Sequence, residues 1–298
     1  MSDVLVVGSA VVDFVFEVDT LPDRPQKYRA RGARIVGGGC AANAAVAITR
    51  LGGNAHLAAR LAEDPAGQLI VAGLQAERVS TVLTSKVPGG ESSYSSVYVD
   101  RNGERQIMNF RGKNLQDEPD WTLPPLDAVL TDTRWEQGAI AAMKAARERG
   151  IPGVVDAEAP VVREALELAS HVAFSRQGLD EYMPEGTLED RLSMVASMLG
   201  SWVCVTDGAE GVYWAQGKRR GHVPAFRVTA VDTLAAGDIW HGAFTLALAE
   251  GTDELSAVRF ANAAAALKCT RKGGRAGAPR REETIRFLQE RSHELDAR

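Results

Sequence analysis

The sequence predicts an α/β protein: a doubly wound, mostly parallel sheet flanked by helices, with a small antiparallel β lid. Three observations predict this class. Short continuous apolar runs, typical of buried parallel strands, recur along the chain. Segments with helical periodicity separate these runs, as crossover helices do. A second set of segments alternates apolar and polar residues, as half-buried antiparallel strands do.

The first apolar run is Val4–Val7, which ends at Gly8. We expect it and four later runs to be buried strands: Ala128–Leu130, Gly153–Val155, Val172–Phe174 and Val203–Val205. Helices are expected between and after these runs, at Asp64–Arg78, Glu136–Arg149, Val161–Ala169, Leu188–Leu199, Ala236–Glu250 and Glu254–Thr270, with a polar tail helix from about Arg281.

The alternating segments are Asp13–Asp19, Lys27–Ile35, Tyr94–Asp100 and Glu104–Phe110. Asp100-Arg-Asn-Gly103, between the last two, is a strong signal for a hairpin turn. We therefore expect one domain over residues 1–298. Its lid is discontinuous and is formed by about residues 12–20, 26–36 and 92–112.

Composition limits the class of protein. The chain has 298 residues, 45% of them hydrophobic, and a net charge of −5, so the charge gives no sign of a nucleic-acid partner. No apolar run approaches the roughly 18 residues that span a bilayer. The N-terminus lacks a basic segment, and the three cysteines lack metal spacing. We expect a cytoplasmic protein with reduced thiols and no membrane partner.

The strongest local motif is Asp232-Thr-Leu-Ala-Ala-Gly-Asp238, which leads into an apolar helix. Small residues at a helix start leave its first N–H groups close to any ligand that docks there, and such N–H groups bind anions. Asp238 in the first turn is placed to take a proton from a hydroxyl that attacks a bound phosphoryl group. Taken alone, the motif also fits an ordinary helix start with an acidic residue.

A second helix that starts with small residues makes the ordinary helix start a weaker explanation of the Asp232–Asp238 motif. Gly37-Gly-Gly-Cys-Ala-Ala-Asn43 opens an Ala-rich helix, and three consecutive glycines cost chain entropy. They permit a small polar ligand to approach the backbone, and the Asn43 amide both donates and accepts hydrogen bonds. Two such helix starts in one α/β chain predict two ligands.

With these motifs the chain resembles the ribokinase-like (PfkB) carbohydrate kinases over its whole length. The resemblance implies a ribokinase-like fold, ATP and Mg²⁺ as cofactors, and Asp238 as the catalytic base. It implies an anion hole at Ala235, Ala236 and Gly237. It also leaves room for a monovalent cation such as K⁺. The implied sugar contacts are Asp13, Gly38, Gly39 and Asn43, and the implied nucleotide-binding residues are Thr206, Gly208, Gly211 and Gly274.

Two departures from the family pattern stand out. Ala235 replaces a glycine that is usual at that position, which adds one methyl group to the anion hole. The family commonly has Asn-x-x-Glu after the strand at Val172–Phe174, where it organises Mg²⁺; here the chain has Ser175-Arg-Gln-Gly178. Mg²⁺ is still expected with ATP, because phosphoryl transfer needs its charge, but the protein ligands of the metal are unknown.

Within the family, several segments are similar to sulfofructose kinases, among them Lys27-Tyr28, Asp132-Thr-Arg-Trp135 and Gly103–Asn109. This resemblance implies transfer of phosphate from ATP to the 1-hydroxyl of 6-deoxy-6-sulfofructose, in sulfoquinovose breakdown (sulfoglycolysis). A sulfonate is a permanent anion and needs fixed donors. Arg134, at the end of a strand, suits a forked contact to it, and Lys27 and Asn109 are expected on lid strands that close over the same group.

Each of these residues also has an ordinary interpretation. Lys27 fits a solvated charge, Asn109 an exposed polar residue, and Arg134 an ion-pair partner of Asp132 or Glu136. We interpret Arg111 and Lys113 as surface charges and His241 as a structural histidine. Arg275 lies in a glycine-rich loop that shapes a nucleotide or cation site.

Other functions fit the sequence less well. Kinases of the same fold act on fructose, fructose 6-phosphate, 2-keto-3-deoxygluconate or nucleosides, and a C6 phosphate also suits Lys27 and Arg134. A catalytically silent sugar-binding regulator has no need of Asp238. A Rossmann dehydrogenase is set aside because the first turn, Gly8–Asp13, lacks Gly-x-Gly-x-x-Gly. Exposed lid edges predict a homodimer formed through the lid.

Overall fold

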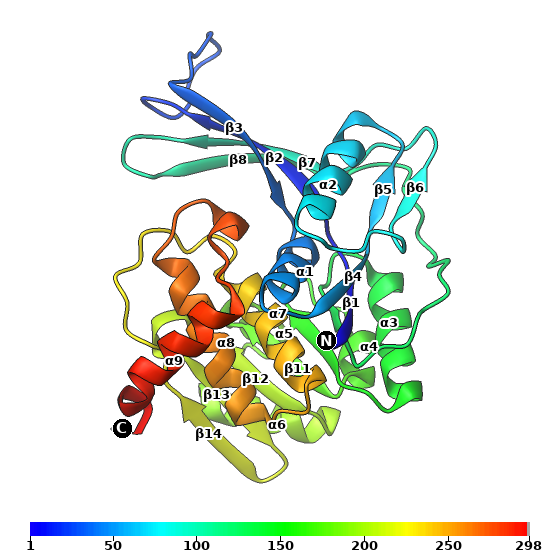
Figure 1. Ribbon diagram of the computed structural model, residues 1–298, viewed down its shortest axis with the longest axis vertical. Helices are drawn as coiled ribbons and strands as arrows, with labels where there is room; N and C mark the ends of the chain where they lie inside the picture. Colours follow the sequence, from blue (N-terminus) through cyan, green and yellow to red (C-terminus); the bar gives the residue numbers. More distant parts are fainter. Residues whose placement is uncertain (297–298) are drawn as a thin grey trace.

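The computed structural model describes residues 1–296, and its core is an eight-stranded sheet (Figure 1). The first six strands of the sheet in chain order pair in parallel, and the last two add an antiparallel hairpin. In spatial order the strands are β14 (Arg219–Val223), β13 (Val212–Gln216), β12 (Trp202–Thr206), β11 (His171–Ser175), β10 (Gly153–Ala157), β9 (Ala128–Thr131), β1 (Asp3–Val7) and β4 (Asn54–Ala58).

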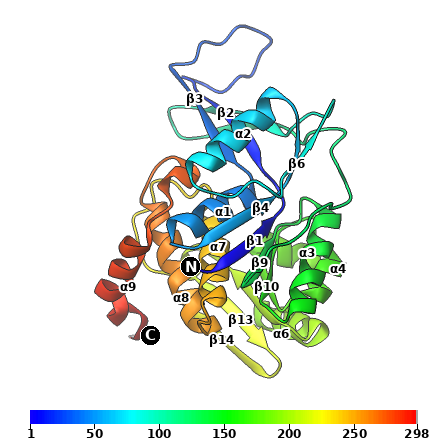
Figure 2. The same cartoon turned by 45° about the vertical axis from the view of Figure 1, so that its right-hand side comes forward.

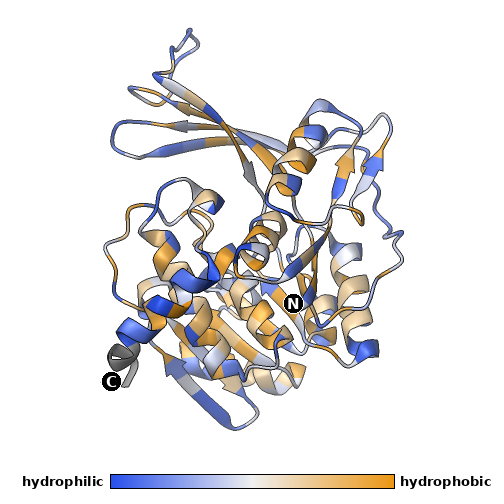
Figure 3. Cartoon of the chain, viewed as in Figure 1, coloured by the Kyte–Doolittle hydropathy of each residue, from blue (hydrophilic) through white to orange (hydrophobic). Residues whose placement is uncertain are grey.

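All five strands predicted from apolar runs are present in this sheet. Their side chains are buried because helices cover both faces of the sheet. Neither face meets solvent, so the strand sequences do not alternate between apolar and polar residues. Figure 3 shows the same distribution, with apolar residues concentrated in the sheet and the helices around it. The prediction of a mostly parallel α/β sheet flanked by helices is therefore confirmed.

Helices form a layer on each face of the sheet (Figures 1 and 2). One layer packs against the inner strands through α1 (Cys40–Arg50), α7 (Ala236–Ala249) and α8 (Glu254–Cys269). The other layer consists of α3 (Glu136–Arg149), α4 (Arg163–Leu168), α5 (Arg176–Tyr182) and α6 (Leu188–Leu199). The chain ends in α9 (Arg281–Asp296), whose start at Arg281 matches the prediction.

The lid is a second sheet that projects from one end of the main domain (Figure 1). Its strand order is β3 (Gly32–Gly38), β2 (Val11–Glu17), β7 (Tyr94–Val99) and β8 (Arg105–Phe110). The outer pairs are antiparallel, as predicted, but the central β2–β7 pair is parallel. The predicted turn joins β7 to β8, where Asp100 accepts hydrogen bonds from the backbone N–H groups of Asn102 and Glu104.

One predicted lid strand begins too early in the sequence. Lys27–Ile35 was expected to be extended, but β3 starts at Gly32 and Lys27 lies in the exposed loop before it. Pro22 and Pro25 give that loop no backbone donors at their positions. The Tyr28 hydroxyl instead closes a local turn, since it accepts the Asp23 and Arg24 N–H groups and donates to the Asp23 carboxylate.

Smaller elements complete the fold. β5 (Arg60–Ala62) and β6 (Ser85–Val87) form a two-stranded parallel sheet, and α2 (Pro65–Ala76) packs against β2 and β3 of the lid. Two short 3-10 helices, η1 (Gly208–Glu210) and η2 (Gly274–Gly277), follow β12 and α8. Within residues 1–296, no helix is long and apolar enough to cross a membrane.

Candidate active site

The start of α7 presents unpaired backbone donors. Ala235 has a left-handed backbone with φ of 64°, and no side chain caps the helix. Within the described chain, the N–H groups of Gly237 and Asp238 donate to no backbone carbonyl, whereas the next residue, Ile239, bonds back to Ala235. A Cβ built at Gly237 would meet no atom within 4 Å. These properties suit the predicted anion hole.

Asp238, the predicted base, lies one residue further along the first turn. Its Oδ2 accepts a hydrogen bond of 2.7 Å from the side-chain amide of Asn43, which is on α1. Burial raises the pKa of Asp238 to about 6, while the hydrogen bonds from Asn43 and Cys40 act in the opposite direction. A carboxyl group with such a pKa is ionised at neutral pH and still accepts a proton readily.

The glycines before α1 allow β2 and the helix start to approach each other. A Cβ on Gly39, whose φ is 94°, would overlap the backbone of Ser9 and Ala10. A Cβ on Gly38 would lie 2.6 Å from Oδ2 of Asp13. Glycine is therefore required at position 39, and at position 38 a side chain would displace the Asp13 carboxylate, which lies beside the backbone that leads into α1.

Asp13 belongs to a chain of polar groups that continues across the lid. Ser95 is paired with Asp13 across β2 and β7, where it favours the ionised Asp13 carboxylate, and its hydroxyl accepts a 3.0 Å hydrogen bond from the Asn109 amide. Burial raises the pKa of Asp13 from its ordinary value, and Ser95 and the charge of Arg275 oppose that shift. The predicted contacts Asp13 and Asn109 are thus joined through Ser95, which the sequence alone did not identify.

Asp132 organises the turn after β1. Its carboxylate accepts hydrogen bonds from the N–H and hydroxyl of Ser9, and from the N–H groups of Ala41 and Arg134. A side chain on Gly8 would overlap this carboxylate. Asp132 therefore ties the β1 turn to the start of α1 and to Arg134. The sequence suggested Asp132 or Glu136 as the ion-pair partner of Arg134, but in the structure Arg134 pairs with Glu158 at 2.8 Å.

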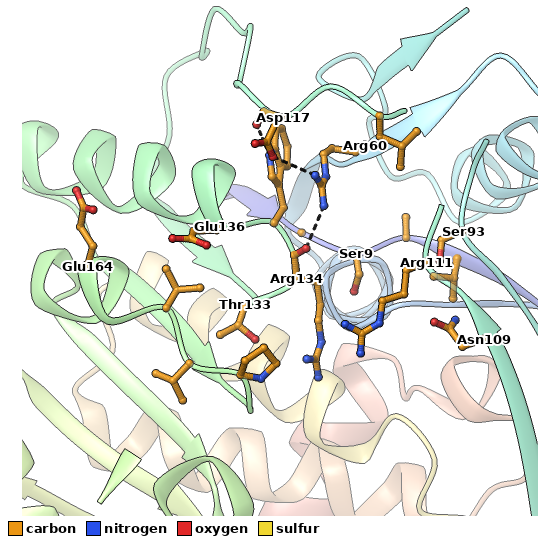
Figure 4. A pocket seen from close by; sticks show the side chains of 18 of the residues that line it. Ser9, Arg60, Ser93, Asn109, Arg111, Asp117, Thr133, Arg134, Glu136 and Glu164 are labelled. Atoms are coloured by element: carbon orange, nitrogen blue, oxygen red, sulfur yellow. Dashed lines mark hydrogen bonds and ion pairs between the residues drawn. The ribbon is translucent and has the colours of Figure 1, made fainter. Parts of the chain in front are cut away.

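A cavity of about 840 Å³ opens between the lid and the ends of β1 and β9 (Figure 4). Asn109, Arg111 and Arg134 line it, and Figure 4 shows both guanidinium groups extending into it. Arg134 also donates to the Ala159 carbonyl at 2.7 Å, and its guanidinium carries more N–H donors than these bonds use. Arg111 has no ion pair or hydrogen bond to another described residue. The cavity thus contains an unpaired cation.

Two further arginines line the same cavity but are already engaged. Arg60 pairs with Asp117 at 3.2 Å and donates to the Arg134 carbonyl. Arg163 lies over the ring of Tyr182. Lys27 does not line the cavity, because the β2–β3 loop carries it outward, and Lys113 does not line it either.

The predicted nucleotide residues lie at the ends of strands and in or beside the two short 3-10 helices. Thr206 ends β12, and Gly208 begins η1. A Cβ on Gly211 would overlap the Val223 carbonyl, so this glycine is needed for the hairpin itself. Gly274 has φ of 57° at the start of η2, and its N–H donates to Asp232.

The Ser175–Gly178 segment supplies no carboxylate for a metal. The Ser175 hydroxyl caps α5 by accepting a hydrogen bond from the Gly178 N–H. A Cβ at Gly178 would overlap the Ala157 carbonyl oxygen. A glutamate therefore has no room at position 178. The family's usual arrangement for Mg²⁺ is absent from this segment for a steric reason.

Buried acidic and imidazole groups lie beneath Asp238. The ligand atoms of Cys40, Asp156 and Asp238 lie within 4.8 Å of one another. Burial raises the pKa of the Cys40 thiol and of Asp156 well above their usual ranges. Mg²⁺ binds oxygen ligands, so the Cys40 sulfur does not suit it. Burial lowers the pKa of His241 to about 4, and its Nδ1 lies 3.3 Å from Asp156. The buried, neutral imidazole fits the structural role expected for His241.

The fold and the site define a kinase class: a helix start with free N–H groups, a carboxylate base beside them, and a lidded cavity at the ends of parallel strands. Residues 1–281 match the family model described as the pfkB family carbohydrate kinases. The chain belongs to this family. It is an enzyme that transfers a phosphoryl group from ATP to a sugar hydroxyl.

Individual relatives agree with this assignment. The ribokinase of Bacillus subtilis is 29% identical over 297 residues, covering 97% of this chain and all of the relative. A crystal structure from Agrobacterium tumefaciens, provisionally assigned as a ribokinase, has a TM-score of 0.91 and 35% identity over 98% of this chain and 99% of that one. Arabidopsis thaliana ribokinase in complex with ribose and ATP has a TM-score of 0.86 and 26% identity, covering 97% and 99% of the two chains. Other relatives are named deoxyribokinase and fructokinase.

Proposed function

We propose that this kinase transfers the γ-phosphoryl group of ATP to the 1-hydroxyl of 6-deoxy-6-sulfofructose. The observation that carries the proposal is the cavity lined by Asn109, Arg111 and Arg134. Two guanidinium groups, one of them without a protein partner, favour an acceptor that carries a negative charge. A sulfonate offers three acceptor oxygens and a permanent negative charge that does not depend on pH. The ribokinase and fructokinase relatives support a sugar acceptor without identifying it.

The positions of the charged groups fit a ketose that reacts at one end and is held at the other. Asp238 and the N–H groups of Gly237 and Asp238 lie at the start of α7. The cavity lies on the opposite side of the α1 start, where Ser9 contacts both the cavity and the helix backbone. The proposal places the C1 hydroxyl of the ketose at Asp238 and its C6 group toward Arg111.

In this proposal Asp238 accepts the proton of the C1 hydroxyl while that oxygen attacks the γ-phosphorus of ATP. The bond from the γ-phosphorus to the bridging oxygen of ADP breaks, and ADP leaves with that electron pair. The free N–H groups at the α7 start stabilise the charge on the transferring phosphoryl oxygens. Asp13 and Asn43 are expected to hold the sugar hydroxyls.

The residues of the site provide different conditions for the two expected ions, Mg²⁺ and a monovalent cation. Mg²⁺ bound to the triphosphate of ATP would neutralise its charge, and the Ser175–Gly178 segment would contribute no carboxylate ligand to it. A bound monovalent cation does not fit the loops around Asp232, because the Lys268 ammonium already lies among their oxygens.

The test is an ADP-release assay with Mg·ATP and a panel of acceptors: 6-deoxy-6-sulfofructose, fructose 6-phosphate, fructose, ribose, 2-keto-3-deoxygluconate and adenosine. We expect the highest kcat/KM with 6-deoxy-6-sulfofructose and a product phosphorylated on C1 by ³¹P NMR. A kcat/KM for fructose 6-phosphate or fructose equal to or above the value for the sulfosugar contradicts the substrate assignment, while the kinase assignment stands.

We also propose that the protein is a homodimer formed through the lid. Ile35 on β3 and Ile107 and Met108 on β8 are 57%, 58% and 75% exposed, and large apolar side chains on edge strands favour pairing with a second copy. Light scattering is expected to give twice the mass of one chain, and Ile107→Asp to shift it toward one. A monomeric mass for the unmodified protein at micromolar concentration contradicts this proposal.

A further inference from the structure

Lys268 has an unusual place for a lysine. It lies in the last turn of α8, and its side chain is completely buried. Lysine is almost never fully buried unless its ammonium group has partners, because desolvation of the charge is costly. Because Lys268 is fully buried, its ammonium group must have partners within the protein.

Oxygen atoms surround the Lys268 ammonium. Nζ donates to the backbone carbonyl of Asp232 at 2.6 Å and to the carbonyl of Arg271 at 3.5 Å, and it lies 3.5 Å from Oδ1 of Asp232. Carbonyl and carboxylate oxygens only accept, and an ammonium has three N–H groups to donate. The number of donors therefore matches the number of oxygen partners.

The same oxygens connect the segments on either side of the predicted phosphoryl site. The Asp232 carboxylate accepts the N–H groups of Leu234, Gly273 and Gly274, and Arg105 from the lid lies 3.4 Å from it. Asp232 begins the loop that continues directly into Ala235–Asp238. Lys268 thus holds the first residue of the anion-hole loop against the turn at Arg271–Gly274.

This oxygen cluster is of the kind that binds monovalent cations, which take backbone carbonyl and carboxylate oxygens as ligands. An ammonium group and K⁺ are similar in size and charge. We propose that Lys268 is a built-in replacement for a bound monovalent cation, that it positions the loop at residues 232–238 for phosphoryl transfer, and that this enzyme therefore works without K⁺.

The charges around Lys268 are consistent with a permanent cation there. Burial lowers the pKa of Lys268 from its ordinary value, and the Asp232 carboxylate opposes that shift. Burial by itself raises the pKa of Asp232, but the backbone donors and Lys268 bring it below its ordinary value, so the carboxylate stays ionised. A K⁺ ion entering the same oxygens would meet the ammonium at close range and be repelled.

Two variants of Lys268 distinguish the effect of its positive charge from the effect of its side-chain volume. Lys268→Ala removes the ammonium and leaves space among the oxygens for an ion. Lys268→Met keeps most of the volume of the side chain but has no charge, and leaves little space for an ion. Melting temperatures are measured for the whole protein in chloride salts of K⁺, NH₄⁺, Na⁺, Li⁺ and tetramethylammonium at one ionic strength.

For the unmodified protein and for Lys268→Met, we expect the melting temperature of each to be the same in all five salts, apart from general salt effects. Lys268→Ala is expected to melt several degrees higher in K⁺ or NH₄⁺ than in tetramethylammonium, with saturation as the ion is titrated. This readout needs no substrate, so it does not depend on the sugar proposed above.

Turnover provides the second readout, and this arm rests on the proposed substrate. With Mg·ATP and 6-deoxy-6-sulfofructose, kcat of the unmodified enzyme is expected to change less than about twofold between K⁺ and tetramethylammonium. Lys268→Met is expected to lose about tenfold or more in kcat with little change in KM for the sugar. K⁺ or NH₄⁺ is expected to restore kcat in Lys268→Ala. Absence of turnover by the unmodified enzyme counts against the substrate and not against Lys268.

Three results overturn the proposal. One is saturable stabilisation or activation of the unmodified protein by K⁺ over tetramethylammonium, since that requires an open cation site. Another is a folded Lys268→Ala variant that responds equally to all five cations. The third is Lys268→Met with unchanged kcat. If Lys268→Ala does not fold in any salt, the unmodified protein and Lys268→Met still decide between the outcomes.

Discussion

Asn43 donates a 2.7 Å hydrogen bond from Nδ2 to Oδ2 of Asp238, and this bond links the first turns of α1 and α7. The two residues are 195 positions apart, and each stands at a helix start built from small residues. The bond orients the Asp238 carboxylate and favours its ionised form. It also joins the predicted sugar contacts to the predicted base.

The first prediction concerns Asp238 itself. Asp238→Asn removes the proton acceptor but keeps the size of the side chain, so turnover is expected to fall by roughly 10²-fold or more. ATP affinity, measured by calorimetry, is expected to stay within a few-fold. Glu254→Gln is the matched control, since it removes a carboxylate from the first turn of α8 without touching the site. Turnover of Asp238→Asn near that of the control would remove Asp238 from the role of base.

The pH dependence of catalysis follows from the raised pKa of Asp238. The base must be ionised to act, so kcat/KM is expected to fall as the pH drops through about 6. Asn43→Ala removes a bond that favours the ionised carboxylate, so the midpoint is expected to move to higher pH.

Asn262→Ala is the control for this shift, because Asn262 is also a buried asparagine but its partners are the Trp240 indole and the Pro224 carbonyl, not the Asp238 carboxylate. Its pH midpoint is expected to equal that of the unmodified enzyme, whatever its stability. An acid limb that does not move in Asn43→Ala means that a group other than Asp238 controls it.

The sequence predicted the fold well where the signal was local. Val4–Val7 and the other apolar runs are buried on both faces, and a continuous run is the pattern that such strands require. The helix from Glu136 to Arg149 has the predicted ends because Gly150 takes the left-handed conformation that stops it. Lys27 was misplaced because alternation suggested a strand in a segment where the prolines and Tyr28 form a loop.

The site was predicted only in part, because some of its features depend on contacts between distant segments. Asp238 and Asn43 were identified from small-residue helix starts, but their hydrogen bond joins α1 to α7. Arg111 was interpreted as a surface charge; it is exposed, and it also lines the cavity, which no local pattern in the sequence indicates. The buried ammonium of Lys268 depends on an oxygen cluster that includes Asp232, 36 residues earlier.

The third prediction tests the cationic cavity. Arg111 has no protein partner, so Arg111→Ala is expected to cost little stability and to lower kcat/KM for 6-deoxy-6-sulfofructose by about 10- to 100-fold, the value of one charge-assisted hydrogen bond. Activity on fructose is expected to change little. Lys113→Ala, a nearby cation outside the cavity, is the control.

Arg134→Ala is expected to show the same selectivity with a larger loss, since it also leaves Glu158 without its partner. Equal losses on the sulfosugar and on fructose would assign Arg134 a structural role instead. The ratio of the two kcat/KM values, compared across Arg111→Ala, Arg134→Ala and Lys113→Ala, separates recognition of the anion from damage to the fold.

The last prediction compares two glycines that have opposite surroundings. A Cβ at Gly178 overlaps the Ala157 carbonyl, whereas a Cβ at Gly237 meets nothing within 4 Å. Gly178→Ala is therefore expected to lower the free energy of unfolding by about 1–3 kcal/mol. Gly237→Ala is expected to raise it by about 0.5–1 kcal/mol, because glycine is unfavourable in a helix, and yet to reduce kcat. The fold has no need of glycine at position 237, so a stable variant with low turnover means that the space above this helix start is kept for the transferring phosphoryl group. Full activity in a stabilised Gly237→Ala protein would place the phosphoryl group elsewhere.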